Sequence, residues 1–188
     1  MKYTAYKNRN GMSYDKKETW LNFLALTTVI FVVAAIMSTF KCEEYSAKSV
    51  LYQEQASVEW TNFQSQNLKL YVSETQKAVL VLEINTISKW KKDIIAAYQK
   101  KINEYEQSVN SYKKEKLELK KKAERFESLR DEARAHSKEF WMALIFLLVS
   151  VLISSIAALI KMKYVWVLGI GVGLVGLFYF MNGFLLLI

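Results

Sequence analysis

Few side chains in this sequence of 188 residues could carry out covalent or metal chemistry. The only cysteine, Cys42, and the only histidine, His136, each lie next to a long apolar stretch. A thiol beside an imidazole is the arrangement of a cysteine nucleophile and its base, but no catalytic motif surrounds either residue. One histidine and one cysteine without clustered carboxylates are too few ligands for zinc, and a lone cysteine excludes an internal disulfide. The sequence therefore predicts no enzyme, no metal site and no cofactor.

The glycines near the C-terminus offer a second candidate site. Gly171, Gly173 and Gly176 have the spacing of a dinucleotide-binding fingerprint, but they lie inside an apolar stretch with no βαβ unit around them. Small residues instead let helix backbones approach closely in a membrane. We therefore predict helix packing between two stripes of small residues. These are Gly169, Gly173, Gly176 and Gly183 on one helix, and Ser150 and Ser154 on the helix before it.

The distribution of glycine and proline favours long helices. The sequence has no proline, and no glycine lies between Met12 and Leu168. Three uncharged apolar stretches, 20–40, 140–160 and 164–188, are long enough to cross a hydrocarbon core of roughly 30 Å. The first is too long for a signal peptide and no cleavage site follows it. We predict an all-α membrane protein with three transmembrane helices.

The basic residues predict how the chain is oriented. The tail 1–19 has five basic and two acidic side chains, and the short link between the second and third spans has Lys161 and Lys163. Short basic segments stay in the cytoplasm. The N-terminus is therefore expected in the cytoplasm, and segment 41–139 and the C-terminus outside it. This pattern accounts for the net charge of +8 without a nucleic-acid partner.

Segment 88–140 has the repeat of a coiled coil. Apolar residues recur at alternating steps of four and three, interrupted only by Lys116, Arg130 and Ser137. The apolar members are Ile95, Tyr98, Ile102, Tyr105, Val109, Tyr112, Leu119, Ala123, Phe126, Ala133 and Phe140. Because the chain must return to the membrane, we predict that 41–139 is a long antiparallel coiled-coil hairpin with its turn near 85–90.

Aromatic residues are expected to pack inside this hairpin. We expect Trp60 and Phe63 to lie against the segment Tyr105–Tyr112 of the other arm, with Tyr98 nearer the turn. The alternative is a binding site on the hairpin that includes Trp60. A separate apolar run near the turn contains Val79, Leu80, Val81 and Leu82. It is either buried in a thicker bundle or a contact patch for another copy or another protein.

Two stretches resemble a family of bacterial membrane proteins, domain of unknown function 4337. They are Ala56-Ser57-Val58-Glu59-Trp60-Thr61-Asn62-Phe63-Gln64 and the ending Asn182-Gly183-Phe184-Leu185-Leu186-Leu187. The resemblance covers roughly 46–188. It implies a three-span protein of the bacterial inner membrane, with a long helical domain in the periplasm. It implies no activity.

Two functions are compatible with these features. The first is a structural or scaffold protein of the lipid bilayer, which forms homo-oligomers or docks onto a larger membrane complex through the hairpin. The second is a homo-oligomeric channel or pore with Asn182, a strongly polar residue of the third span, near its lumen. Otherwise Asn182 is expected to bond to a neighbouring helix. The absence of charged side chains in the spans disfavours the channel.

Overall fold

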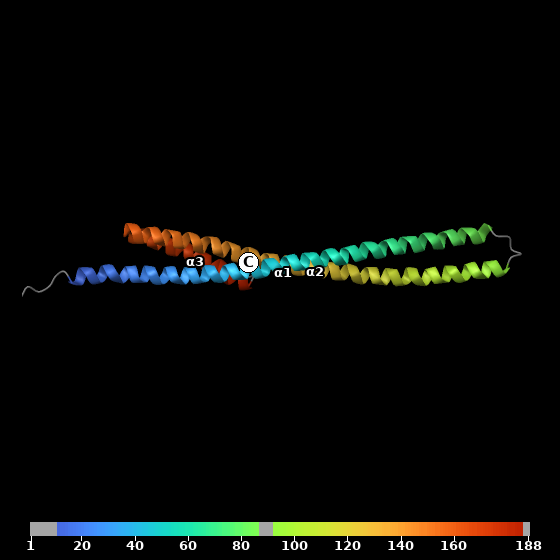
Figure 1. Ribbon diagram of the computed structural model, residues 1–188, viewed down its shortest axis with the longest axis horizontal. Coiled ribbons are helices and arrows are strands. Elements are labelled where there is room, and N and C mark those ends of the chain that lie inside the picture. Colours follow the sequence, from blue (N-terminus) through green and yellow to red (C-terminus); the bar gives the residue numbers. More distant parts are fainter. Residues whose placement is uncertain (1–10, 87–91, 186–188) are drawn as a thin grey trace, which may run out of the picture. The chain divides into compact units, whose positions relative to one another are not determined.

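Apart from Lys161 and Met162, the residues that the structure describes are helical. This computed structural model describes residues 11–86 and 92–185, with side chains from Thr19 onward. It contains α1 (Gly11–Thr86), α2 (Lys92–Ile160) and α3 (Lys163–Leu185), and these described residues contain no strand (Figure 1). Each helix includes a stretch long and apolar enough to cross a membrane. The predictions of an all-α chain and of three membrane-length helices are confirmed.

The two longest helices each combine segments that the sequence treated separately. Helix α1 begins at Gly11, within the predicted tail 1–19, and ends at Thr86. The predicted turn near 85–90 falls mainly on residues 87–91, which lie outside the described residues. Helix α2 includes both the second arm and the second apolar stretch. It ends before Lys161, whose φ of 58° is the left-handed conformation that often terminates a helix.

The chain divides into two compact units, which are described separately. The first unit comprises Met1–Lys48 and Glu132–Ile188, and the second comprises Ser49–Asp131. The three apolar stretches all belong to the first unit. The second unit contains parts of α1 and α2 alone.

In the first unit, two clusters of buried apolar residues hold the helices together. One contains Phe31, Ala34, Ala35 and Leu147 and receives Leu177 from α3. The other contains Trp20, Leu24 and Ala157, with Val165 and Trp166 of α3 packed against it. Trp166 also donates a hydrogen bond of 3.3 Å from Nε1 to the Thr27 hydroxyl. Both clusters thus contain residues of all three helices.

The glycines of α3 lie where the neighbouring helices come closest. A Cβ built on Gly173 would lie 2.4 Å from the ring of Phe31 and 2.7 Å from the hydroxyl oxygen of Ser150. A Cβ on Gly176 would lie 2.9 Å from the side chain of Leu147. The Ser150 hydroxyl also donates a 2.7 Å hydrogen bond to the Gly169 carbonyl. The stripe of small residues on α3 therefore lies against α2, and Gly173 also meets α1.

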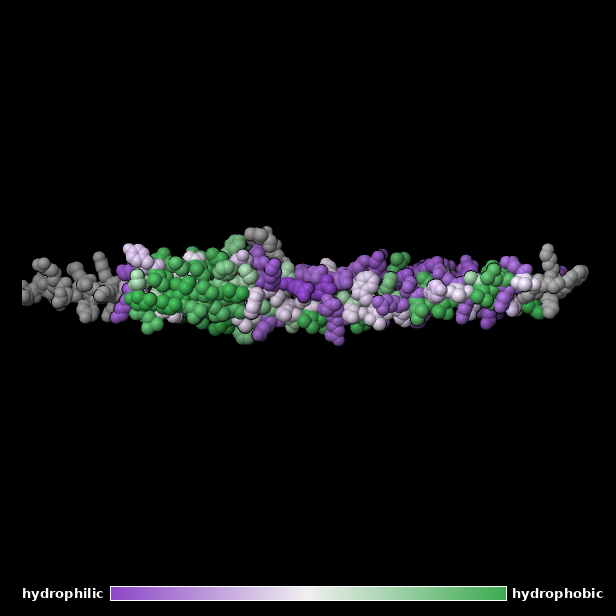
Figure 2. Space-filling view, turned by 90° about the horizontal axis from the view of Figure 1, so that it is seen from above, coloured by the Kyte–Doolittle hydropathy of each residue, from purple (hydrophilic) through white to green (hydrophobic). Residues whose placement is uncertain are grey.

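The outward-facing side chains of the first unit are mostly apolar. On α1 they include Phe23, Ile30, Ile36 and Phe40, all of them exposed. In Figure 2, hydrophobic residues gather over this unit, whereas hydrophilic residues prevail over the second unit. Such an apolar exterior is suited to contact with lipid chains.

In the second unit, α1 and α2 each carry a row of buried or half-buried side chains at alternating steps of three and four. On α2 every predicted member of the repeat that lies in this unit is buried or half-buried. On α1 the same spacing of three and four defines a row that we call the inner row. Each of its members is buried or half-buried, and they are Ser49, Tyr52, Ala56, Glu59, Phe63, Gln66, Leu70, Ser73, Lys77, Leu80 and Ile84.

Polar contacts join α1 to α2 along the whole of the second unit. Figure 1 shows the two helices side by side there. From the first of these contacts to the last, the partner on α2 changes from Arg130 to Glu106, and only the adjacent residues Gln66 and Asn67 depart from this order. The contacts are Gln53 with Arg130 at 2.8 Å, Trp60 with Glu127 at 3.0 Å, Gln66 with Glu115, Asn67 with Lys116 at 2.6 Å, Glu74 with Lys113 at 3.0 Å, and Lys77 with Glu106 at 3.2 Å.

The tight approach at Gly173 predicts how a single methyl group would act. We expect Gly173→Ala to lower the thermal midpoint of unfolding in detergent, because its Cβ would overlap the Phe31 ring. Overpacking of this kind costs about 1–3 kcal/mol. Gly171→Ala is the matched control, since a Cβ there would meet nothing within 4 Å. Equal midpoints for the two variants would contradict this packing.

Candidate functional site

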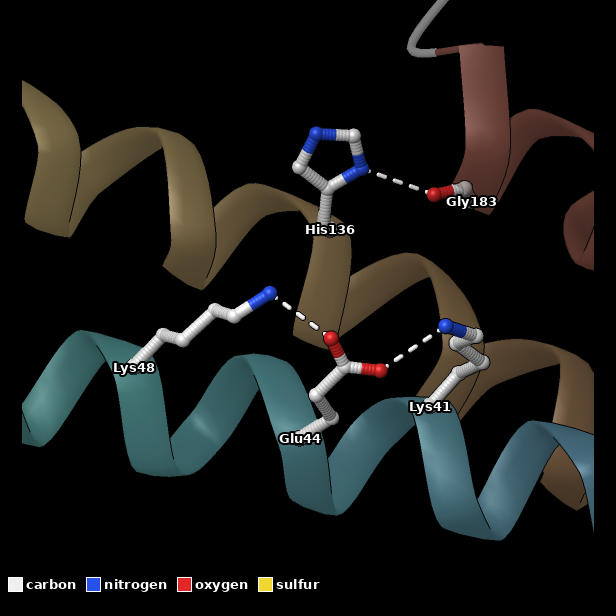
Figure 3. Close-up of polar contacts among 5 residues, drawn as sticks. All are labelled: Lys41, Glu44, Lys48, His136 and Gly183. Atoms are coloured by element: carbon white, nitrogen blue, oxygen red, sulfur yellow. Dashed lines mark hydrogen bonds and ion pairs between the residues drawn. The ribbon is translucent and has the colours of Figure 1, made fainter.

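A polar and aromatic cluster surrounds His136 in the first unit. The imidazole Nδ1–H donates a hydrogen bond of 2.7 Å to the carbonyl oxygen of Gly183, near the end of α3 (Figure 3). The opposite partner is Tyr45 of α1, whose ring stacks on the imidazole with centroids 4.5 Å apart. His136 therefore links all three helices, and it satisfies a carbonyl in the last turn of α3, where intrahelical donors run out.

Phe140 lies one turn further along α2 and forms the apolar side of this cluster. Its side chain is fully buried. Its ring stacks with Tyr45 at 5.9 Å and meets the edges of Phe180 and Phe184 at 5.9 and 5.0 Å. A Cβ on Gly183 would lie 2.9 Å from the same ring. The aromatic rings and the His136 hydrogen bond therefore hold the same turn of α3.

Cys42 and His136 have different partners. The Cys42 sulfur lies 3.5 Å from the Ser137 hydroxyl oxygen, and that hydroxyl donates a 3.2 Å hydrogen bond to the Cys42 carbonyl. The described contacts of these two residues include no hydrogen bond between thiol and imidazole. A nucleophile needs such a bond to its base. The described residues likewise contain no group of three or more His, Cys, Asp or Glu side chains placed to hold a metal.

Asn182 lies between helices and is 5% exposed. Its amide donates a 2.9 Å hydrogen bond to the carboxylate of Glu139 on α2. A bond to a carboxylate is stronger than one between neutral groups. Asn182 is thus engaged within a single copy of the chain, one residue before the carbonyl that His136 holds.

Beside this cluster, Glu44 lies between two lysines on one face of α1. Its carboxylate oxygens accept hydrogen bonds from Lys41 at 2.8 Å and Lys48 at 2.7 Å (Figure 3). These two hydrogen bonds, first that of Lys41, and the two positive charges lower the pKa of Glu44 to about 2. The carboxylate stays ionised at any physiological pH, and the three side chains form an exposed charged group with a net charge of +1.

In the second unit, Phe63 of the inner row and the nearby Trp60 form an aromatic pair. Their rings meet edge to face at 5.4 Å. The Trp60 indole donates to Glu127, and the Lys116 ammonium lies 5.1 Å from the centre of the Phe63 ring. The expected contact with Tyr105–Tyr112 is replaced by these partners. The reason is the pairing of Lys77 with Glu106 and of Glu74 with Lys113, which places those tyrosines opposite later residues of α1.

The three tyrosines of α2 are half-buried along the facing row. They are Tyr98, Tyr105 and Tyr112. The negative charge of Glu83 and a hydrogen bond from the Tyr98 hydroxyl to its carboxylate raise the pKa of Tyr98 above its ordinary value. Glu83 belongs to α1, so this contact joins the two helices close to their ends.

The apolar run 78–82 points in more than one direction. Leu80 belongs to the inner row and is half-buried, whereas Val79, Val81 and Leu82 are 46%, 40% and 66% exposed. One part of the run therefore packs on α2, while the other part remains uncovered in a single copy.

Sequence reasoning did not anticipate the partners of His136. Tyr45 and Glu139 carry no motif, and the acceptor at Gly183 is a backbone carbonyl that no side-chain pattern reveals. One signal was present: Tyr45, His136 and Asn182 all lie near an end of an apolar stretch. Polar side chains at such ends commonly satisfy the terminal groups of neighbouring helices.

These features define a class of protein, namely an all-helical chain with three membrane-length helices and an additional unit of two paired helices. The family model described as domain of unknown function DUF4337 matches residues 20–186. The chain belongs to that family, which confirms the resemblance noted in its sequence. No curated protein and no solved structure matches the chain.

The contacts of His136 predict a local effect on α3. We expect His136→Ala to loosen the last turn of α3, because the variant loses one hydrogen bond and one ring stack. Each contributes about 0.5–1.5 kcal/mol. Amide hydrogen exchange of residues 180–185 in detergent should accelerate. Lys138→Ala removes an exposed side chain of the same turn and serves as the control. Unchanged exchange in His136→Ala would show that this contact does not hold the helix end.

Proposed function

We propose that this protein is a structural or scaffold protein of the bacterial inner membrane. Its three apolar stretches span the bilayer, with the N-terminus in the cytoplasm. The segment 41–139 extends outside the membrane as an antiparallel coiled-coil hairpin. Through this hairpin the protein assembles with further copies or docks onto a larger complex of the cell envelope.

The basic residues support this orientation. Lys161 lies in the short link between α2 and α3, Lys163 is the first residue of α3, and the segment 1–19 is also basic. Two crossings separate these segments and put both on one side, which the positive-inside rule assigns to the cytoplasm. The polar second unit then lies on the opposite side.

The contacts of the second unit support an antiparallel hairpin. Gln53, early in α1, contacts Arg130, whereas the later residue Lys77 contacts Glu106, which precedes Arg130 in α2. Both helices present a row with the heptad spacing to each other, as the helices of a coiled coil do.

The observation that carries the assembly proposal is the small core of this hairpin. Among the described side chains of residues 49–131, only six are buried, and three of these are alanine or serine. They are Ala56, Leu70, Ser73, Ile102, Val109 and Ala123. Helical stability in proteins comes mainly from tertiary packing. A pair of long helices with so little buried apolar surface therefore needs further helices beside it.

The contact of Asn182 bears on the channel alternative. Its amide is bonded to Glu139 of the same chain and is almost fully buried. An amide engaged in this way is not available to line a lumen, so we retain the scaffold as the proposed function.

The hairpin predicts a specific crosslink within one chain. In a Cys42→Ala background, Glu74→Cys with Lys113→Cys should be joined by a short bis-maleimide reagent, because the two native side chains form an ion pair. Glu74→Cys with Lys100→Cys is the control with the same reactive groups. Intramolecular products, detected by mass spectrometry after proteolysis, should form in the first pair alone. Equal products in both pairs would contradict the pairing of the arms.

Assembly predicts a complex larger than one chain. The protein extracted from its native membrane in a mild detergent or in polymer-bounded lipid discs should have a mass of at least two copies, or of a copy with fixed partners. Native mass spectrometry measures both mass and composition. A single chain of 21.9 kDa without a protein partner would refute the proposal.

A further inference from the structure

The side of α1 that faces away from α2 carries a second heptad row, which we call the outer row. Its members follow steps of three and four from residue 51 to residue 82, and they are Leu51, Glu54, Val58, Thr61, Ser65, Leu68, Val72, Thr75, Val79 and Leu82. Each is offset by two residues from a member of the inner row. Two residues correspond to about 200° around a helix, so the outer row lies on the opposite side of α1.

All ten members of the outer row are exposed, although six of them are leucine or valine. Its leucines and valines are between 44% and 66% exposed, and the largest values belong to Leu68 and Leu82. Figure 2 shows hydrophobic patches that interrupt the hydrophilic surface of this unit. Scattered apolar residues on a surface need no explanation, but a row with regular heptad spacing over 32 positions is typical of a helix with a partner.

The charges of the two helices show which partner fits. The exposed positions of α2 are dominated by lysine and glutamate, for example Lys114, Glu118 and Lys121. The outer row of α1 contains a single charged residue, Glu54. Two such rows can face each other with almost no charge repulsion, whereas a charged helix would lose hydration against them. The complementary surface for the outer row is another row of the same kind.

We propose that the outer row pairs with the outer row of a second copy as a parallel two-stranded coiled coil. The residues at the first heptad position are mainly valine, namely Val58, Val72 and Val79, and both leucines after Leu51 are at the fourth position. β-Branched residues at the first position with leucine at the fourth favour two parallel strands. The parallel direction rests on the proposed function, which inserts every copy into the membrane in the same orientation.

The size of the outer row is sufficient for a specific contact. From residue 51 to residue 82 the helix rises about 47 Å and is about 10 Å wide. The contact therefore covers on the order of 500 Å² per copy, or roughly 1,000 Å² in total, which is near the lower limit for a specific interface. The membrane anchors strengthen it further, because they hold the two helices at a high local concentration.

The composition of the row also locates its strongest part. Glu54 would face Glu54 of the second copy, and like charges at facing positions destabilise a coiled coil. Four of the six apolar residues of the row, Leu68, Val72, Val79 and Leu82, lie toward the other end. The pairing is therefore strongest over 68–82, which includes the exposed part of the apolar run 78–82.

Disulfide formation in native membranes tests the proposal. In a Cys42→Ser background we expect Val72→Cys and Val79→Cys to form disulfide-linked dimers on mild oxidation, severalfold more than Lys114→Cys. Lys114 is exposed on α2 next to Lys113, the partner of Glu74, so it lies at the same level of the hairpin. The readout is a non-reducing gel, with the dimer band identified by mass spectrometry.

A second variant covers the case in which a cysteine disturbs the contact. Val72→Glu with Val79→Glu places two charges on the outer row, and should reduce the dimer severalfold by native mass spectrometry. Lys114→Glu with Lys121→Glu is the control with the same added residues, and should leave the dimer unchanged. Retention of the helical circular dichroism of all variants verifies folding, because each altered side chain is exposed.

The outcomes separate this proposal from the proposed function. A multimeric complex that crosslinks through Lys114→Cys but not through Val72→Cys would refute the outer row and leave self-assembly standing. A monomer with no partner would refute both. A crosslink from Val72→Cys to a different protein would refute the pairing of two copies and leave docking onto a larger complex standing.

Discussion

Apolar helices in a bilayer gain little free energy by leaving lipid for each other, since lipid chains are as apolar as leucine. Their association depends on close contact, and in the first unit that contact is possible because Gly173 has no side chain. The Phe31 ring and the Ser150 hydroxyl occupy the space that a Cβ would need. Ser150 then reaches the Gly169 carbonyl. The hydrogen bond of His136 depends on the same close approach of α3, because its acceptor is the carbonyl of Gly183, which lies further along the helix than Gly169 and Gly173.

The second unit is held by a different balance of forces. Its helices meet through a narrow row in which small residues such as Ala56, Ser73 and Ala123 are buried together with Leu70, Ile102 and Val109, and the contacts beside them are hydrogen bonds and exposed ion pairs. Exposed ion pairs contribute about 0–1 kcal/mol each. These ion pairs therefore stabilise the two helices little, and their main effect is to determine which residues of α1 and α2 face each other. Association through the outer row would supply the apolar burial that one hairpin lacks.

The fold class followed from composition, and the row on α2 was predicted residue by residue because apolar side chains occupy nearly all its positions. The inner row of α1 was not, since Glu59, Gln66, Ser73 and Lys77 interrupt its pattern. On this helix the more apolar of the two rows points away from α2, and both rows have the same spacing. Periodicity alone therefore does not show which row faces α2. The cluster around His136 escaped prediction for another reason: it is completed by a backbone carbonyl, and sequence patterns describe side chains.

The uninterrupted heptad spacing on both arms has a consequence for how such proteins could vary. Suppose that seven residues were removed from each of the two helices, at positions that face one another. Each remaining residue would then keep its heptad position and would face the same partner as before. Each such step would shorten the second unit by about 10 Å, while the pairing of the remaining residues stays as it is. The length of the second unit can therefore change in fixed increments of two helical turns without altering which of the remaining residues are paired.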